Sequence, residues 1–118
     1  ECLAAGFSGK HYYCTVNPLC YAEKAFRLPQ KNGEKRAVLI IGGGSAGMEA
    51  AITAKKRGFE ATIWEKSNRL GGLLWAASAP AFKHDVKNLL NYLITQCNKD
   101  GVNVIYDKEA TKADLKRL

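Results

Sequence analysis

The stretch VLIIGGGSAGMEAAITAKKRGFEATIWEK, residues 38–66, decides the fold. An apolar, partly β-branched run at residues 37–41 ends abruptly at three glycines, which is typical of a strand buried on both faces of a parallel sheet. Helix-forming residues follow at 45–57 and stop at Gly58, a residue that suits a left-handed cap. Residues 60–65 then form a second short strand. This order predicts a β-α-β unit with a right-handed parallel crossover.

Three glycines between the first strand and the helix, Gly42, Gly44 and Gly47, form a G-x-G-x-x-G motif. The motif is weak alone, but a strand before it and a helix after it are the context of a dinucleotide site. There the first glycine permits a tight turn, the second lets a pyrophosphate approach the backbone, and the third lets helix and strand pack closely. Free N–H groups and the positive end of the helix dipole would face the phosphates. The predicted dinucleotide-binding residues of this turn are Gly42, Gly43, Gly44, Ser45 and Gly47.

An acidic residue, Glu65, ends the second strand. It follows the glycines by about twenty residues, where a carboxylate accepts hydrogen bonds from the ribose hydroxyls of the adenosine. A 2'-phosphate would be repelled by this acid, so the site favours FAD, NAD or ADP over NADP. The alternative is a structural glycine-rich turn with a solvated Glu65. The agreement of strand, helix, spacing and acid disfavours that alternative.

The segments after this unit continue the alternation of helix and strand. Residues 67–82 carry few helix signals and are expected to form a loop. Apolar residues at i, i+3, i+4, i+7, i+8 and i+11 from position 86 to 97 predict an amphipathic helix that ends before Gly101. Residues 102–106 predict a third strand, and the tail at 113–118 could start another helix.

Together these elements predict an α/β fold with a Rossmann-like, doubly wound parallel sheet of the FAD/NAD(P)-binding type. Residues 1–34 hold three of the four cysteines, two of the three prolines and no sustained period, so an irregular arm and linker is expected there. Residues 35–118 would form the dinucleotide-binding domain, truncated at its C-terminal end. A sheet of three parallel strands leaves an unpaired edge, which favours dimerisation or strand exchange.

The composition is that of an ordinary globular chain with surplus positive charge. Eighteen Lys and Arg residues against eleven Asp and Glu residues give a net charge of +7, which can attract nucleic acid, anionic lipid or phosphate-bearing ligands. The basic residues are scattered and no aromatic-basic face is found, so a nucleic-acid partner is not expected. No apolar run approaches the roughly 18 residues that cross a bilayer. Cysteines without secretory features indicate a reducing compartment, so we expect a cytoplasmic protein without a membrane partner.

The residues after Glu65 carry a first family resemblance. The sequence KSNRLGG, residues 66–72, resembles the K-x-x-x-L-G-G signature that follows the ribose acid in two-dinucleotide flavoproteins of the glutathione reductase type. In those proteins the signature lies along the adenosine and pyrophosphate, and simple NAD dehydrogenases usually lack it. The resemblance implies that Lys66, Gly71 and Gly72 also bind the dinucleotide. It favours FAD, or at least an ADP moiety, and the alternative is a plain Gly-Gly turn.

The amino-terminal residues carry a second, more specific resemblance. The run ECLAAGFSGKHYYCTVNPLCYAE, residues 1–23, followed by a linker and the glycine motif, resembles the junction in NADH:flavin oxidoreductases of the enoate reductase, 2,4-dienoyl-CoA reductase and trimethylamine dehydrogenase type. In that family four cysteines hold a [4Fe-4S] cluster through soft, anionic thiolates. The resemblance implies that Cys2 and Cys14 correspond to the third and fourth ligands. Two cysteines cannot hold a cubane cluster, so we expect none in this chain alone.

The remaining cysteines and the histidines are expected to have ordinary roles. Cys20 is interpreted as a small packed residue, and Cys97 lies in the apolar stripe and is predicted to belong to the core. His11 and His84 are predicted to lie at the surface, since neither lies beside a plausible nucleophile or carboxylate constellation.

The second resemblance also implies an activity. Proteins of this family reduce activated C=C bonds of enoates or enoyl-CoA substrates, and electrons pass from NADH to FAD, through the [4Fe-4S] cluster to FMN. The cluster and FMN would belong to the full-length parent, in which the cofactors perform the chemistry. No catalytic residue is visible here, so the chain alone is expected to be inactive. The alternative is an ADP-binding domain without a redox role, as in the trimethylamine dehydrogenase branch.

Overall fold

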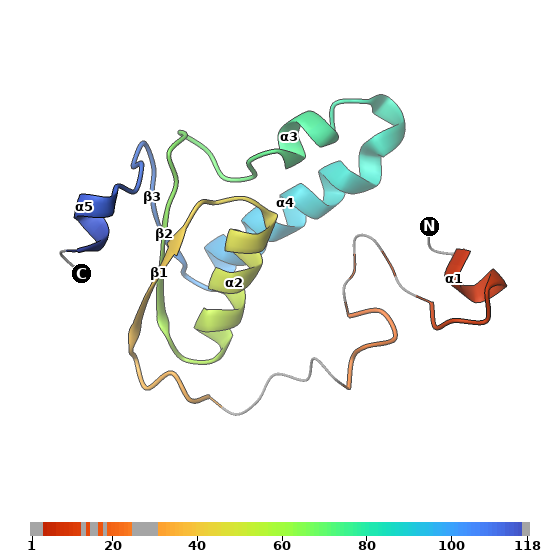
Figure 1. Cartoon of the computed structure of the whole chain (residues 1–118), viewed down its shortest axis with the longest axis horizontal. Helices are drawn as coiled ribbons and strands as arrows, with labels where there is room; N and C mark the ends of the chain where they lie inside the picture. The colour runs from red at the N-terminus through yellow and green to blue at the C-terminus, as the bar shows by residue number, and fades with distance from the viewer. Residues whose placement is uncertain (1–3, 13, 15–16, 18, 25–30, 117–118) are drawn as a thin grey trace.

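A three-stranded parallel sheet forms one layer of the protein in this computed structural model (Figure 1). The structure describes residues 4–12, 14, 17, 19–24 and 31–116. The strands, in spatial order, are β1 (Ala37–Ile41), β2 (Glu60–Trp64) and β3 (Asn103–Ile105). Both neighbouring pairs are parallel. The α/β fold with a parallel sheet, predicted from the sequence, is confirmed.

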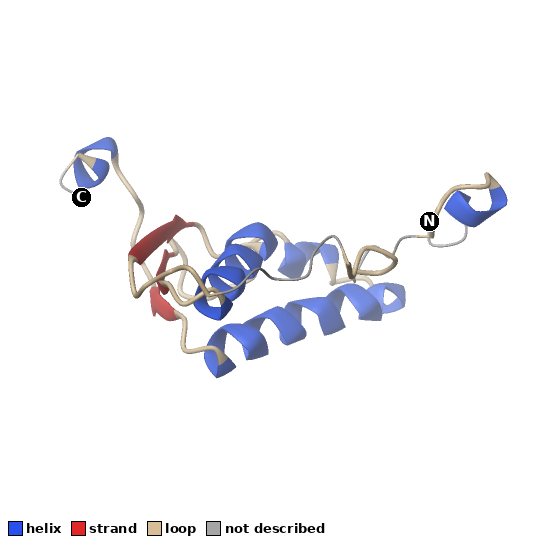
Figure 2. Cartoon of the chain, turned by 90° about the horizontal axis from the view of Figure 1, so that it is seen from below, coloured by secondary structure: helices blue, strands red, loops and turns tan. Residues whose placement is uncertain are grey.

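Two helices, α2 (Ser45–Lys56) and α4 (His84–Lys99), pack against each other on the same side of the strands (Figure 2). Right-handed crossovers that step in one direction along a sheet place their helices on one face. The core lies between these helices and the sheet. Its buried side chains are Met48, Ala51, Ile52, Ala61, Ile63, Leu70, Leu90, Leu93 and Cys97. No helix in the described part of the chain is long and apolar enough to cross a membrane.

The opposite face of the sheet is more open than the sequence predicts. The side chains of Ile41 and Ile105 are 54% and 43% exposed, and they lie on either side of the half-buried Trp64. The Lys108 Nζ atom lies 4.8 Å from the centre of the Trp64 ring. The prediction of a strand buried on both faces is therefore wrong for β1, because both long helices of the described residues cover the other face.

Helix α2 ends at the glycine that the sequence singles out. Gly58 has a φ of 90°, in the left-handed region, and it follows the last turn of the helix directly. The Gly33 amide donates a hydrogen bond of 2.8 Å to the Arg57 carbonyl, which satisfies an acceptor at the end of the helix. The last residues of the linker thus lie against the regular domain. The boundary after residue 34 stays a prediction.

Short helices occur where the sequence predicts none. They are α1 (Ala4–Phe7) in the amino-terminal arm, and α3 (Leu74–Ala77) and the 3₁₀ helix η1 (Ala81–Lys83) in the predicted loop. The Trp75 indole N–H donates to the Leu70 carbonyl at 2.8 Å, and α3 packs against α4. Tertiary contacts therefore stabilise a helix that is too short to be stable alone or to show a period. The loop prediction is wrong for these residues.

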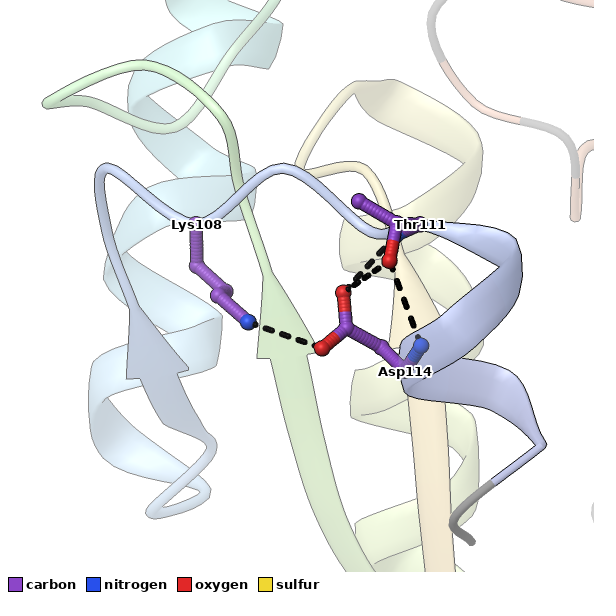
Figure 3. A network of polar contacts seen from close by, with 3 residues as sticks. All are labelled: Lys108, Thr111 and Asp114. Carbon is purple, nitrogen blue, oxygen red and sulfur yellow. Dashed lines mark hydrogen bonds and ion pairs between the residues drawn. The ribbon is translucent and has the colours of Figure 1, made fainter.

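The other predicted elements are confirmed with shifted ends. Helix α4 extends beyond its apolar stripe, and β3 is shorter than the predicted strand. The tail forms α5 (Lys112–Leu115), which begins with a capping box: the Thr111 hydroxyl accepts from the Asp114 amide at 3.2 Å, and the Asp114 carboxylate accepts from the Thr111 amide at 2.9 Å. Asp114 also pairs with Lys108 at 3.2 Å (Figure 3). The Thr111 hydroxyl and amide hold the pKa of Asp114 below its ordinary value.

Candidate dinucleotide-binding site

The corner between β1 and α2 is open to a ligand. Gly42 has a φ of 91°, a left-handed conformation that side chains rarely adopt. Its amide donates to the Trp64 carbonyl at 2.8 Å, which anchors the corner to β2. A Cβ atom on Gly42 or Gly44 would meet no atom within 4 Å. The corner therefore leaves space for a phosphate to reach the backbone.

The helix that leaves this corner presents free amides toward it. The first hydrogen bond of α2 runs from the Met48 amide to the Gly44 carbonyl, at 2.9 Å. The amides of Ser45, Ala46 and Gly47 consequently have no partner within the helix. Three amides and the positive end of the helix dipole at a helix start form an anion-binding arrangement.

The third glycine of the motif brings helix and strand together. A Cβ atom on Gly47 would collide with the Gly42 carbonyl oxygen, and it would also lie 3.4 Å from Cγ2 of Ile40 in β1. Only a residue without a side chain permits this approach. The packing role predicted for the third glycine is confirmed.

The Glu65 side chain lies against the glycine corner. Glu65 is 6% exposed and directly follows β2. Its Oε2 atom accepts a hydrogen bond from the Gly43 amide at 2.6 Å, and its Oε1 atom accepts from the amide and the hydroxyl of Ser67, each at 2.8 Å. The backbone of this turn is itself held by the loop after β3, because the Lys108 amide donates to the Glu65 carbonyl at 3.0 Å. The carboxylate is therefore fixed at the end of the sheet where the motif opens.

Glu65 is held in its ionised form. Burial alone would raise the pKa of this carboxyl, but the hydrogen bonds from Ser67 and Gly43 together lower it below its ordinary value. The positive charge of Lys66 adds to this lowering. A buried carboxylate whose partners are all donors stays negative at neutral pH, as a ribose-binding acid must.

This lowered pKa predicts a pH dependence of stability. The folded pKa of Glu65 lies below its unfolded value of about 4.3. The contribution of ionised Glu65 to the unfolding free energy is therefore complete above the unfolded pKa, and it is lost as the pH falls through both pKa values. The melting temperatures of the wild-type protein and of Glu65→Gln, measured from pH 7 to pH 3, should therefore converge at the acid end. A difference in melting temperature that stays constant from pH 7 to pH 3 would contradict a lowered pKa of Glu65.

A second glycine pair lies directly beside the corner. The Gly71 amide donates to the Gly43 carbonyl at 2.8 Å, and a Cβ atom on Gly72 would lie 3.4 Å from Gly44 Cα. Gly71 and Gly72 have φ values of 118° and 49°, which favour glycine. The structure thus brings the glycine turn, the acid and the second glycine pair together. Of the predicted residues in this region, Ser45 and Lys66 have exposed side chains without a described hydrogen bond.

Residues that the sequence did not single out hold this arrangement. Ser67 donates two hydrogen bonds to Glu65, and the Leu70 side chain occupies the place of a Cβ on Gly43. Two cationic side chains lie over the Trp75 ring, with Arg69 Cζ at 4.6 Å and Lys87 Nζ at 4.0 Å from the ring centre. A hydroxyl two residues after a strand-end acid was a usable local signal for Ser67. The contacts of Trp75 have no such signal, because Lys87 lies in a separate helix, α4.

The predicted cluster ligands are described only in part. Cys2 lies outside the described residues, and Cys14 is a half-buried free thiol. Within the described ranges, no three His, Cys, Asp or Glu side chains are close enough to hold a metal ion. Cys97 is buried in the core as predicted, and burial raises the pKa of its thiol to about 11. The surface positions predicted for His11 and His84 are confirmed, and Cys20 is half-buried.

Comparison with known proteins adds the family to this geometry. The family described as FAD dependent oxidoreductase matches residues 37–116. The chain belongs to this family. The FAD dependent oxidoreductase match covers the glycine corner, Glu65 and the second glycine pair. The resemblance to flavin oxidoreductases that the sequence suggested is thereby confirmed.

The chain is also similar to individual oxidoreductases. The chain is 39% identical over 98 residues to an NADH oxidase of Thermoanaerobacter brockii, covering 83% of this chain and 15% of that protein. It is 39% identical over 105 residues to a cinnamate reductase of Clostridium sporogenes, covering 89% and 16%. Among solved structures, a 2-naphthoyl-CoA reductase in complex with 2-naphthoyl-CoA matches with a TM-score of 0.85 and 29% identity, covering 98% of this chain and 18% of that one. The chain therefore spans less than a fifth of the length of these relatives.

Proposed function

We propose that this chain binds the ADP half of FAD within an oxidoreductase that reduces activated C=C bonds. The observation that supports the ligand is the open corner at Gly42 and Gly44, where a Cβ would meet nothing, next to the ionised Glu65. Phosphates would accept hydrogen bonds from the free amides at the start of α2. The ribose would donate a hydrogen bond from a hydroxyl to the Glu65 carboxylate. Bound FAD would supply the capacity to accept and release a hydride.

The electron donor and the substrate in this proposal are inferred from the names of the relatives. Their names include an NADH oxidase, a cinnamate reductase and a 2-naphthoyl-CoA reductase, which supports NADH as donor and an enoate or enoyl-CoA as substrate. We extend the proposal to the order NADH, FAD, [4Fe-4S] cluster and FMN, with Cys2 and Cys14 as two of the four cluster ligands. The remaining ligands, FMN and the catalytic residues would come from the rest of the protein, so the chain alone would have no reductase activity. A cytoplasmic location, based on the cysteine usage, and self-association through the free sheet edge are also part of this proposal.

The ligand proposal is tested by Gly44→Ala. Gly44 has a φ of −73°, so alanine fits its backbone, and the new Cβ would point into open space. We expect a change in unfolding free energy within about 0.5 kcal/mol and an affinity for ADP that is about tenfold to a hundredfold weaker, because phosphate contacts with amides are charge-assisted. The measurement is calorimetric titration of the nucleotide-free protein with ADP.

The matched control is Gly101→Ala, at the opposite end of the sheet from the corner. Its Cβ also meets nothing within 4 Å, so any stability change comes from its φ of 66°. We expect unchanged ADP affinity in this variant. Equal ADP affinity in Gly44→Ala and in the wild type would contradict the proposed phosphate site. Flavin absorbance of the full-length protein separates FAD from the alternative ligand ADP, which is colourless in the visible.

A further inference from the structure

The Glu65 carboxylate has little acceptor capacity left for a ligand. An ionised carboxylate offers about four lone-pair positions, two on each oxygen. The amide and the hydroxyl of Ser67 occupy both positions on Oε1, and the Gly43 amide occupies one on Oε2. One position remains, on the oxygen that faces the glycine corner. A ribose presents two neighbouring hydroxyls, so the acceptors and the donors do not match in number.

The Ser67 hydroxyl is the group that decides this count. Its oxygen lies 2.8 Å from Glu65 Oε1 and 2.8 Å from the Arg69 carbonyl oxygen, but a hydroxyl has one proton to donate. A hydrogen bond to a charged oxygen is roughly twice as strong as one to a neutral carbonyl. The Ser67 hydroxyl therefore donates its hydrogen bond to Glu65 Oε1 and not to the Arg69 carbonyl. The Ser67 amide is part of the backbone and cannot move away from Oε1 without opening the turn.

We propose that Glu65 binds only one of the two ribose hydroxyls, and that Ser67 sets this selectivity by occupying Oε1. The inference rests on the proposed function, since it assumes that the corner binds an adenosine diphosphate. Ser67 acts here as a positioning residue, through the carboxylate. The second ribose hydroxyl stays in contact with water.

The test compares ADP, 2'-deoxy-ADP and 3'-deoxy-ADP on the nucleotide-free protein by calorimetric titration. For the wild type, one deoxynucleotide should bind about tenfold more weakly than ADP or worse, because it lacks a hydrogen bond to a charged group. The other deoxynucleotide should lose less than about threefold, since its missing hydroxyl has no protein partner. For Ser67→Ala, which frees a position on Oε1, both deoxynucleotides should bind about fivefold more weakly than ADP or worse.

Ser78→Ala is the matched control. Ser78 is also half-buried and its hydroxyl donates to a backbone carbonyl, that of Trp75 at 3.1 Å, without touching Glu65. Its nucleotide profile should equal that of the wild type. A merely structural role of Ser67 would weaken all three nucleotides alike and leave their ratios unchanged.

Several outcomes overturn the inference while leaving the proposed function intact. ADP binding with equal losses for both deoxynucleotides in the wild type would show that Ser67 yields its position. No loss for either would show that Glu65 does not bind the ribose. Identical nucleotide ratios in Ser67→Ala and in the wild type would remove Ser67 from the selectivity. Failure of ADP itself to bind would overturn the proposed function, and this inference with it.

Discussion

Gly47→Val is expected to lower the unfolding free energy of the protein by about 3 kcal/mol or more. The new side chain would occupy the place of the Gly42 carbonyl oxygen, and its Cβ would also press on Ile40. Neither neighbour can yield easily, because the Gly42 backbone is tied to β2 and Ile40 packs against the core. Domains of this size are stable by only about 5–15 kcal/mol, so the loss is a large share of the total.

The measurement is urea unfolding followed by circular dichroism, with Ala46→Val as control. Ala46 is the preceding residue of the same helical turn, and its side chain is exposed. Valine there costs only its lower helix propensity, less than about 0.7 kcal/mol. Equal unfolding midpoints for the two variants would show that α2 does not approach β1 as closely as the structure describes.

Glu65→Ala is the second change with a large expected effect. It removes the acceptor of the Gly43 and Ser67 amides, and the Gly43 amide is buried. A buried donor without a partner costs about 1–3 kcal/mol, so the two together should lower the unfolding free energy by about 3 kcal/mol or more. The glycine corner would also lose its connection to the turn after β2. We therefore expect ADP affinity to fall in the same variant.

Glu60→Ala is the control for charge and strand position. Glu60 begins the same strand, its side chain is 63% exposed, and it pairs with Lys55 at 2.9 Å. Exposed ion pairs contribute at most about 1 kcal/mol, so this variant should remain close to the wild type in stability and in ADP affinity. If thermal unfolding showed similar losses of stability for Glu60→Ala and Glu65→Ala, the Glu65 carboxylate would not be what connects the glycine corner to the turn after β2.

Strongly local signals predicted most of the fold. Continuous segments gave the strand before the glycines, the helix after them and the apolar stripe of α4. Gly58 marked the end of the first helix, because glycine adopts the left-handed conformation easily. The spacing from the glycines to Glu65 also predicted that acid and turn would meet. Binding of a dinucleotide by these residues stays a prediction.

Contacts between distant segments could not be predicted in the same way. Helix α3 has four residues, too few to show a period, and it packs against the separate helix α4. The exposure of Ile41 and Ile105 depends on which face of the sheet the helices cover. Alternation within each strand does not determine which of its two faces is covered.

By itself, the sequence determined the order of strands and helices, the glycine corner and the acid that follows it, because these depend on residues whose conformational limits act over a few neighbours. Only the tertiary structure decided that Glu65 points at the Gly43 amide, which lies 22 residues earlier in the chain. Hydrogen-bond partners depend on distances of a few tenths of an ångström between segments that are separate in the chain. Those distances are set by packing, and packing is a property of the whole fold.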